Sequence, residues 1–362
     1  MGKHMLTFLL TFVILLAPVC INNYVMVIND TLEQGLAFEV AQLSKIIPNT
    51  VIHFPDRNFE DAVRALLGKP EGNIIASDVV EITKLNVSNL SITDLTGIEY
   101  FTSITELDCA YNELTMLELN SNVELSVLSC EANRLTELNF SQNAKLTELY
   151  CALNGLTALH VSQNPLLKKL DCTECRLTEL DISQNSLLES LSLYNNELAV
   201  LDVSQNTALS FLNCEMNQLT TLDVSRNPAL KKLVCSGNQL TLLDVSQNTS
   251  LQELSCFGNQ LMMLDVSQNS ELVDISCGQN LLTSFDVSQC LALEKLWCDW
   301  NQLATLDVSF NSALKNLSCR NNFFPAKSAI IGLDETRLAK FAFDPQTNMV
   351  QESTMPATNI GE

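Results

Sequence analysis

The chain has 362 residues, with 20 Lys and Arg against 42 Asp and Glu, which gives a formal net charge of −22. This acidity argues against a nucleic-acid or anionic-membrane partner, because both need a basic protein surface. A hydrophobic fraction of 46% excludes disorder over most of the chain. With only His4, His53 and His160, histidine-based catalysis and zinc binding have almost no material.

The amino terminus predicts export. A short basic start precedes an apolar run from Met5 to Val19, which is typical of a secretory signal and short for a membrane span. Cys20 follows directly, as in a bacterial lipobox, although Val19 is not the small residue which that motif prefers. Three interpretations stay open: a lipoprotein with its lipid on Cys20, plain secretion, or an uncleaved anchor. We therefore assign residues 1–20 to the signal and 21–50 to a tether, with the rest outside the cytoplasm.

The segment that follows predicts a helix. Phe59, Val63 and Leu66 recur at helical spacing on one face, and Gly68 is a stop signal. The loop at 68–73 lacks the carboxylate spacing of a calcium-binding loop, so no calcium site is expected there.

A repeat of 21 residues organises most of the chain. Its frame is L-x-x-L-x-C-x-x-N-x-L-x-x-L-D-V-S-Q-N-x-x, and one full copy runs from Leu209 to Leu230. The cysteines of the frame are separated by 21 residues, except for one gap of 42 with Leu193 at its midpoint. They are Cys109, Cys130, Cys151, Cys172, Cys214, Cys235, Cys256, Cys277, Cys298 and Cys319. Such a fixed period predicts a solenoid of stacked coils, each with one short strand.

The frame matches the leucine-rich-repeat pattern, and the sequence resembles the internalins, above all the internalin-J type with a cysteine ladder. Residues 82–101, ITKLNVSNLSITDLTGIEYF, resemble an internalin entry coil. The resemblance implies a mostly β, α/β solenoid: a curved leucine-rich-repeat rod over 82–324. It also implies a helical amino-terminal cap at 51–81. We expect a short carboxyl-terminal cap and tail at 325–362, with a capping strand near 340–345.

Two columns of asparagine follow from the frame, one from Asn112 to Asn322 and a second from Asn122 to Asn311. A buried carboxamide at these places can bind backbone groups that are freed where each strand turns. Equivalent residues of stacked strands lie about 4.8 Å apart, so that eleven coils would extend over roughly 50 Å.

The cysteine ladder has three interpretations: apolar core, disulfides or a metal array. Leu193 favours the core, because one coil accepts a hydrocarbon in this position. The coil spacing also exceeds the separation of about 3.8 Å between the Cβ atoms of a disulfide. The pair Cys172 and Cys175 looks like a C-x-x-C motif, but Cys175 occupies the first asparagine column, as Cys290 occupies the second. We interpret both as structural.

A third column contains aspartates, from Asp181 to Asp307. It could bind divalent cations, but solvated turns in which the carboxylates accept nearby N–H or hydroxyl groups are the favoured interpretation.

The variable positions beside the cysteine column carry whatever is specific to this chain. We expect them on the concave face, where bulky side chains are typical of interface hot spots. The predicted partner-binding residues are Tyr150, Tyr194, Phe211, Met216, Phe257, Trp297 and Trp300.

The favoured function is therefore a secreted or surface-anchored bacterial recognition protein. The resemblance to internalins implies adhesion, with a protein or glycan partner bound by the concave face. The first alternative is a passive surface spacer without a specific ligand. An enzyme is disfavoured, since no room is left for a catalytic domain. We expect no cofactor, no metal, no nucleic-acid partner, and no membrane contact except through an amino-terminal lipid or anchor.

Overall fold

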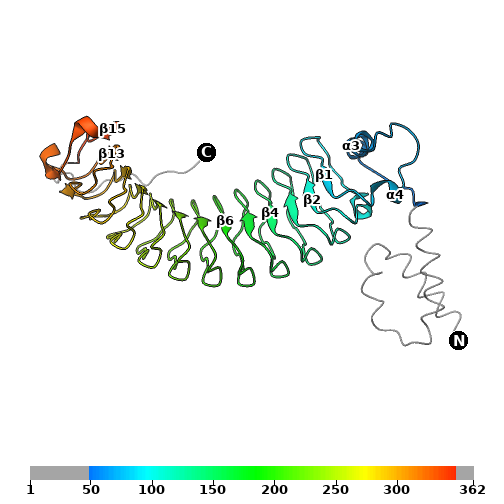
Figure 1. The fold of residues 1–362 in the computed structure, drawn as a ribbon, viewed down its shortest axis with the longest axis horizontal. Coiled ribbons are helices and arrows are strands. Elements are labelled where there is room, and N and C mark those ends of the chain that lie inside the picture. The colour runs from blue at the N-terminus through cyan, green and yellow to red at the C-terminus, as the bar shows by residue number, and fades with distance from the viewer. Residues whose placement is uncertain (1–48, 348–362) are drawn as a thin grey trace, which may run out of the picture. The chain divides into compact units, whose positions relative to one another are not determined.

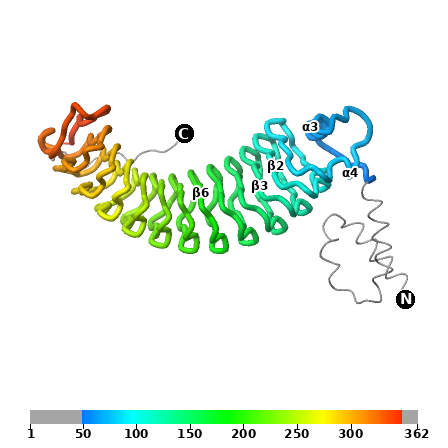
Figure 2. Tube along the Cα trace, in the orientation of Figure 1, coloured from blue at the N-terminus to red at the C-terminus, as the bar shows by residue number. Residues whose placement is uncertain are grey.

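The computed structural model describes residues 49–347, which fall into two compact units that meet in sequence between Asn185 and Ser186. The predicted signal at 1–20, with Cys20, and nearly all of the predicted tether at 21–50 lie outside the described residues. Each unit is a parallel β-solenoid with few helices, so the predicted mostly β solenoid is confirmed (Figure 1). The tube in Figure 2 shows the successive coils of each unit.

The first unit opens with helix α3 (Arg57–Leu67). Asp56 caps its start by accepting the Phe59 N–H at 3.0 Å, and Gly68 ends it with a left-handed φ of 60°. Phe59 and Val63 are buried as expected, but Leu66 is 52% exposed, so its predicted place on the core face was wrong. Leu66 lies in the last turn of α3, beyond the part of the helix whose side chains are buried.

The loop after α3 is held by a guanidinium group. Arg64 donates to the carbonyls of Lys69 at 3.1 Å and Gly72 at 3.0 Å, and it forms an ion pair of 2.7 Å with Glu60. A protein cation therefore binds the carbonyls of this loop.

The strands of the first unit follow at the repeat period. After α4 (Ala76–Val79) come β1 (Lys84–Asn86), the 3-10 turn η2 (Ile98–Tyr100), β2 (Glu106–Asp108), β3 (Val127–Ser129), β4 (Glu148–Tyr150) and β5 (Lys169–Asp171). Each strand pairs in parallel with the next, and equivalent residues lie opposite one another, as Leu128 does to Leu149.

The second unit continues the same pattern. Its sheet contains β6 (Ser190–Ser192), β7 (Phe211–Asn213), β8 (Lys232–Val234), β9 (Glu253–Ser255), β10 (Asp274–Ser276), β11 (Lys295–Trp297), β13 (Asn316–Ser318) and β15 (Lys340–Ala342). A second, two-stranded sheet joins β12 (Leu306–Asp307) to β14 (Ile330–Ile331), and η3 (Lys327–Ala329) and η4 (Glu335–Arg337) are 3-10 turns. Strand β15, which pairs with β13, confirms the predicted capping strand.

The core of each unit consists of leucines and the cysteine ladder. All twelve cysteines among the described residues are buried and free. Leu193 is equally buried in the same column. The interpretation of the ladder as apolar core is therefore confirmed, and the disulfide alternative was wrong.

The first asparagine column links each coil to the one before it. Asn133 donates through Nδ2 to the carbonyls of Cys109 and Cys130, both at 3.0 Å, and its Oδ1 accepts the Leu114 N–H at 2.9 Å. In the second column Asn143 donates to Leu119 and Asn122 at 3.1 and 2.9 Å, but its buried Oδ1 has no hydrogen-bond partner among the described groups. The two columns thus differ in one acceptor.

The residue before each asparagine of the first column has a left-handed backbone. Its φ lies between 51° and 65° in eleven successive coils. These residues are Tyr111, Ala132, Leu153, Glu174, Asn195, Met216, Gly237, Gly258, Gln279, Trp300 and Asn321. Only two are glycine, although a side chain is disfavoured in this conformation. The turn at the end of each strand therefore holds one residue in a left-handed backbone conformation, and in nine of the eleven coils this residue carries a side chain.

Candidate interaction surface

Outward-facing positions define the candidate surface. In most coils of the repeat, the first and third residues of the strand lie at the surface, as Phe211 and Asn213 do around the buried Leu212, whereas Ser318 in β13 is buried. The residue after the ladder position also reaches the surface in several coils, as Glu215 does after Cys214, whereas Ala110, Ala152 and Ser236 are buried there. We call these three outward positions the strand face. The left-handed residue that follows them forms the rim.

The predicted partner-binding residues divide between these places. Tyr150, Phe211 and Trp297 lie in strands β4, β7 and β11, where each is half-buried. Tyr194 and Phe257 follow the ladder position, just after strands β6 and β9. Met216 and Trp300 lie on the rim, 39% and 55% exposed. Tyr150 belongs to the first unit and the other six residues to the second.

Glycines make room for two of these side chains. The Sδ atom of Met216 lies over Gly237, where a Cβ atom would come within 2.6 Å of it. The ring of Phe257 lies over Gly278, where a Cβ atom would be 3.0 Å from Cδ2. Both bulky side chains are therefore oriented by the absence of a side chain in the next coil.

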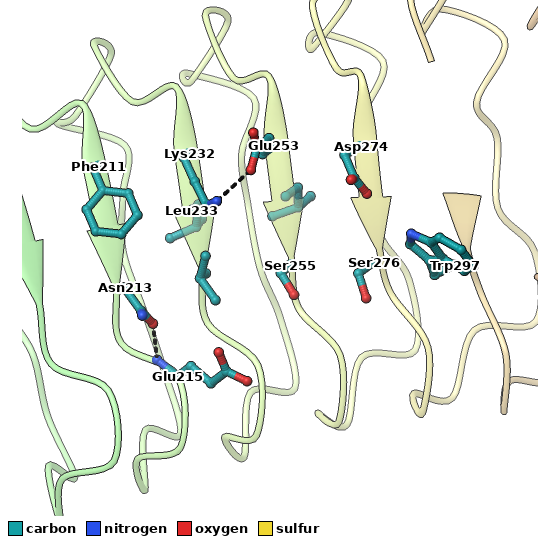
Figure 3. A pocket seen from close by; sticks show the side chains of 12 residues that line it. Phe211, Asn213, Glu215, Lys232, Leu233, Glu253, Ser255, Asp274, Ser276 and Trp297 are labelled. Carbon is teal, nitrogen blue, oxygen red and sulfur yellow. Dashed lines mark hydrogen bonds and ion pairs between the residues drawn. The ribbon is translucent and has the colours of Figure 1, made fainter. Parts of the chain in front are cut away.

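A hollow of about 530 Å³ opens on the strand face of the second unit (Figure 3). Phe211 stands at one end and Trp297 at the other. Four steps between neighbouring coils separate their strands, which corresponds to about 19 Å. Of the predicted residues these two line the hollow, while Tyr194, Met216, Phe257 and Trp300 do not.

Polar side chains cover the hollow between the two rings. Lys232 forms an ion pair of 2.7 Å with Glu253, and Asp274 forms one of 2.9 Å with Lys295. The other polar lining residues are Asn213, Glu215, Ser255 and Ser276. None of these polar residues was predicted from the sequence. The available signal was the run of small residues at the third strand position, Val234, Ser255 and Ser276, just before Trp297.

In the first unit, Tyr150 is surrounded by carboxylates. Its hydroxyl donates to Glu148 Oε2 at 2.7 Å. Burial, this hydrogen bond and the charges of nearby carboxylates raise the pKa of Tyr150 to about 12. Burial, followed by the charges of Asp171 and Asp108, raises the pKa of Glu131. The surface around Tyr150 is therefore acidic.

The ladder cysteines have no accessible chemistry. Burial raises the pKa of Cys256 to about 12, and it is the main cause of the raised pKa of Cys214, also about 12. Cys175 takes the place of an asparagine, and its Sγ donates to the Cys151 carbonyl at 3.5 Å. Cys290 replaces an asparagine of the second column in the same way, with Sγ 3.8 Å from the Asn269 carbonyl. The structural interpretation of both cysteines is confirmed.

The aspartate column forms turns. Asp223 accepts the Ser225 N–H at 2.9 Å, and Asp265 accepts the Ser267 N–H at the same distance. Hydrogen bonds from these serines lower the pKa of both carboxyl groups. The favoured turn interpretation is thus confirmed.

Within residues 49–347, no group of three or more His, Cys, Asp or Glu side chains is placed to hold a metal ion. In the same range, the helices are too short or too polar to span a bilayer.

No protein-family model matches the chain. Internalin J of Listeria monocytogenes serotype 4b (strain F2365) is 40% identical over 70 residues, which are 19% of this chain and only 8% of that protein. The match therefore spans a small part of the relative's length.

Solved structures extend the likeness. A domain of InlJ from Listeria monocytogenes, described as including a cysteine ladder, is 34% identical over 76% of each chain, with a TM-score of 0.49. An internalin (inlF) from Listeria monocytogenes is 22% identical over 81% of this chain and 96% of that one, with a TM-score of 0.68. A leucine-rich-repeat protein of Leptospira interrogans is 25% identical, covers 75% and 74%, and has a TM-score of 0.67. The last two likenesses show the fold.

Proposed function

Because the chain is an internalin-like leucine-rich-repeat protein, we propose that it is a secreted or surface-anchored bacterial recognition protein. It binds a protein or glycan partner through the strand face of the second unit, in adhesion or in contact with host or neighbouring cells. The proposed role is binding rather than catalysis, and it needs no cofactor or metal. The step from family to function is an analogy, since one fold serves many functions.

The observation that carries the proposal is the placement of bulky rings at outward positions. The repeat commits its constant residues to the core and to the asparagine columns, so they cannot distinguish between ligands. Trp297 and Trp300, the two tryptophans of the chain, lie in one coil, and Phe257 in the same unit is 40% exposed. Exposed aromatic side chains on a rigid sheet are typical of binding hot spots.

The test is a double substitution, Trp297→Ala with Trp300→Ala. The immobilised exported chain is incubated with host and bacterial-community extracts, and the proteins and glycans retained are quantified. We expect the double variant to fold but to lose at least about tenfold in affinity for the retained partner, since a truncated hot-spot tryptophan costs about 2 kcal/mol or more.

A matched control is Met262→Ala with Met263→Ala, which removes two exposed apolar side chains outside the strand face. Its capture should equal that of the wild type. If the tryptophan variant captures as well as the wild type, the strand face of this coil is not the site. If neither protein retains a saturable partner, the alternative of a passive spacer replaces the proposal.

A further inference from the structure

The hollow between Phe211 and Trp297 has the dimensions of an extended peptide. It forms because β8, β9 and β10 carry the small residues Val234, Ser255 and Ser276 where β11 carries Trp297. A length of about 19 Å corresponds to about six residues of extended chain. Figure 3 shows the two rings at opposite ends of the hollow, with Ser255, Ser276 and the charged side chains of Lys232, Glu253 and Asp274 between them.

The charged side chains of the hollow indicate the charge of the ligand that it would bind. Its lining contains three carboxylates, on Glu215, Glu253 and Asp274, and one ammonium group, on Lys232. Glu253 and Asp274 each bind a lysine, whereas Glu215 forms no ion pair within residues 49–347. The whole chain, at −22, adds a long-range attraction for cations. The charge of the hollow therefore attracts a cationic ligand and repels an anionic one.

The free carboxylate lies at the same end of the hollow as a ring. Glu215 belongs to the coil of Phe211, and its backbone N–H donates to Asn213 Oδ1 at 3.1 Å, which fixes the turn that presents it (Figure 3). A guanidinium group binds a carboxylate through two parallel hydrogen bonds and also stacks on aromatic faces. Glu215 and Phe211 at one end and Trp297 at the other thus offer both modes of arginine binding.

From this arrangement we infer that the hollow is the anchor site for an arginine-bearing, extended segment of the protein partner. The segment crosses β8, β9 and β10, with arginine side chains on Glu215 and on the ring of Trp297. This inference rests on the proposed function and narrows the partner to a protein with a basic contact surface. A neutral glycan would stack on the rings and donate hydroxyl hydrogen bonds to Glu215, but it would not gain the charge attraction that a guanidinium group gains.

Tryptophan fluorescence tests the inference directly. The substitution Trp300→Phe leaves Trp297, at the end of the hollow, as the sole tryptophan of the chain. This variant is titrated at physiological salt with a blocked peptide of five arginines. Two further ligands are the matched citrulline peptide, which has the same shape without charge, and cellohexaose as a neutral glycan. We expect a saturable change in Trp297 emission with the arginine peptide and none with the other two.

A pair of charge-matched variants locates the contact. In the Trp300→Phe background, Glu215→Gln should weaken arginine-peptide binding by about fivefold, because it removes the unpaired carboxylate. Glu197→Gln removes the same charge from an exposed residue outside the hollow and should change the affinity little. Equal losses in both variants would reduce the effect to the overall charge of the chain and overturn the inference.

Other outcomes separate the inference from the proposed function. If the citrulline peptide binds as well as the arginine peptide, or if cellohexaose alone saturates the emission change, the arginine site is refuted. If no peptide binds while extract partners still require both tryptophans, the proposed function stands and the arginine site fails. If arginine binding depends on Glu215 but the tryptophan double variant captures partners normally, the hollow is not the partner's anchor and the inference also fails.

Discussion

At the scale of a single residue, the carboxylate of Glu131 on the strand face is destabilised in its charged form. Its carboxylate follows Cys130 and is half-buried, with Asp108 and Asp171 as its charged neighbours. Burial and these two charges raise its pKa above the ordinary value of 4.5. The folded chain therefore binds this proton more tightly than the unfolded chain does. Stability that is present below pH 4.5 is lost as the pH rises through the raised pKa.

The substitution Glu131→Gln should therefore stabilise the protein at pH 7.5 and have little effect at pH 4. We expect a gain of less than about 1 kcal/mol, because solvent screens a half-buried carboxylate. Thermal unfolding at the two pH values measures the difference. The control is Glu137→Gln, an exposed glutamate in the same coil. A gain that is equal at both pH values would show that the charge is not the cause.

The ladder position also allows the stability contribution of a single core residue to be tested. Cys214 is fully buried in the column that also accepts Leu193, so Cys214→Leu should cost less than about 1.5 kcal/mol where neighbours can shift. The neighbouring Leu212, also fully buried, fills the core of the same coil. Leu212→Ala should cost about 2–5 kcal/mol through the cavity it leaves. Urea unfolding of the two variants gives both values, and a larger loss for Cys214→Leu would contradict an apolar slot.

At the scale of the repeating element, the two asparagine columns are not equivalent. The first supplies an acceptor to the coil before it, as Asn154 Oδ1 does for the Leu135 N–H at 3.0 Å. The second leaves that oxygen buried without a partner in Asn269 and Asn311, as far as the described residues extend. One cysteine replaces an asparagine in each column, and the thiol is a weak acceptor in both.

These cysteines give a matched pair of substitutions. Cys175→Asn supplies a carboxamide oxygen for the Leu156 N–H, the counterpart of the Leu135 N–H, and should stabilise by about 1 kcal/mol. Cys290→Asn adds the same side chain but buries an unpartnered oxygen, so it should be neutral or destabilising. Denaturant midpoints compare the two. If both variants gain equally, the acceptor is not what distinguishes the columns.

The sequence predicted these elements well because the repeat fixes their register. The spacing of Cys109 to Cys319 placed the strands, and Leu193 identified the ladder as core from the sequence alone. Leu66 was misplaced, because helical periodicity does not say where the packed partner of a helix ends. The hollow could not be predicted from the positions of large side chains, since Ser255 and Ser276 leave it open by being small. The rim position of Trp300 depends on a left-handed backbone, which the sequence there does not signal with glycine.

At the scale of the whole molecule, the cysteines form one protected population. The chain has 13 cysteines, and the twelve within the described residues are all buried and free. A thiol reacts as the thiolate, and burial disfavours that form. The reactivity of the described cysteines should therefore depend on unfolding rather than on the chemistry of any one of them.

Thiol counting without reductant tests this. The folded chain should react at no more than one thiol, that of Cys20, whereas unfolding in guanidinium should release twelve more. A reductant-treated sample, unfolded in the same way, gives the maximum count. A count near zero in the untreated unfolded sample would mean that the ladder cysteines form disulfides.

The asparagine ladder also has a consequence for inheritance. Asn133 bonds to Cys109 and Cys130 in the same way as Asn154 bonds to Cys130 and Cys151, so each coil that keeps the asparagine presents its neighbour with the same set of bonds. An in-frame duplication or deletion of the gene segment that encodes one coil therefore leaves each junction with equivalent donors and acceptors. Recombination can therefore lengthen or shorten the array, while a substitution at an outward position affects its own coil and, where a bulky side chain lies over a glycine as Met216 does over Gly237, the next coil as well. The number of coils can thus change while the outward residues of most coils stay the same.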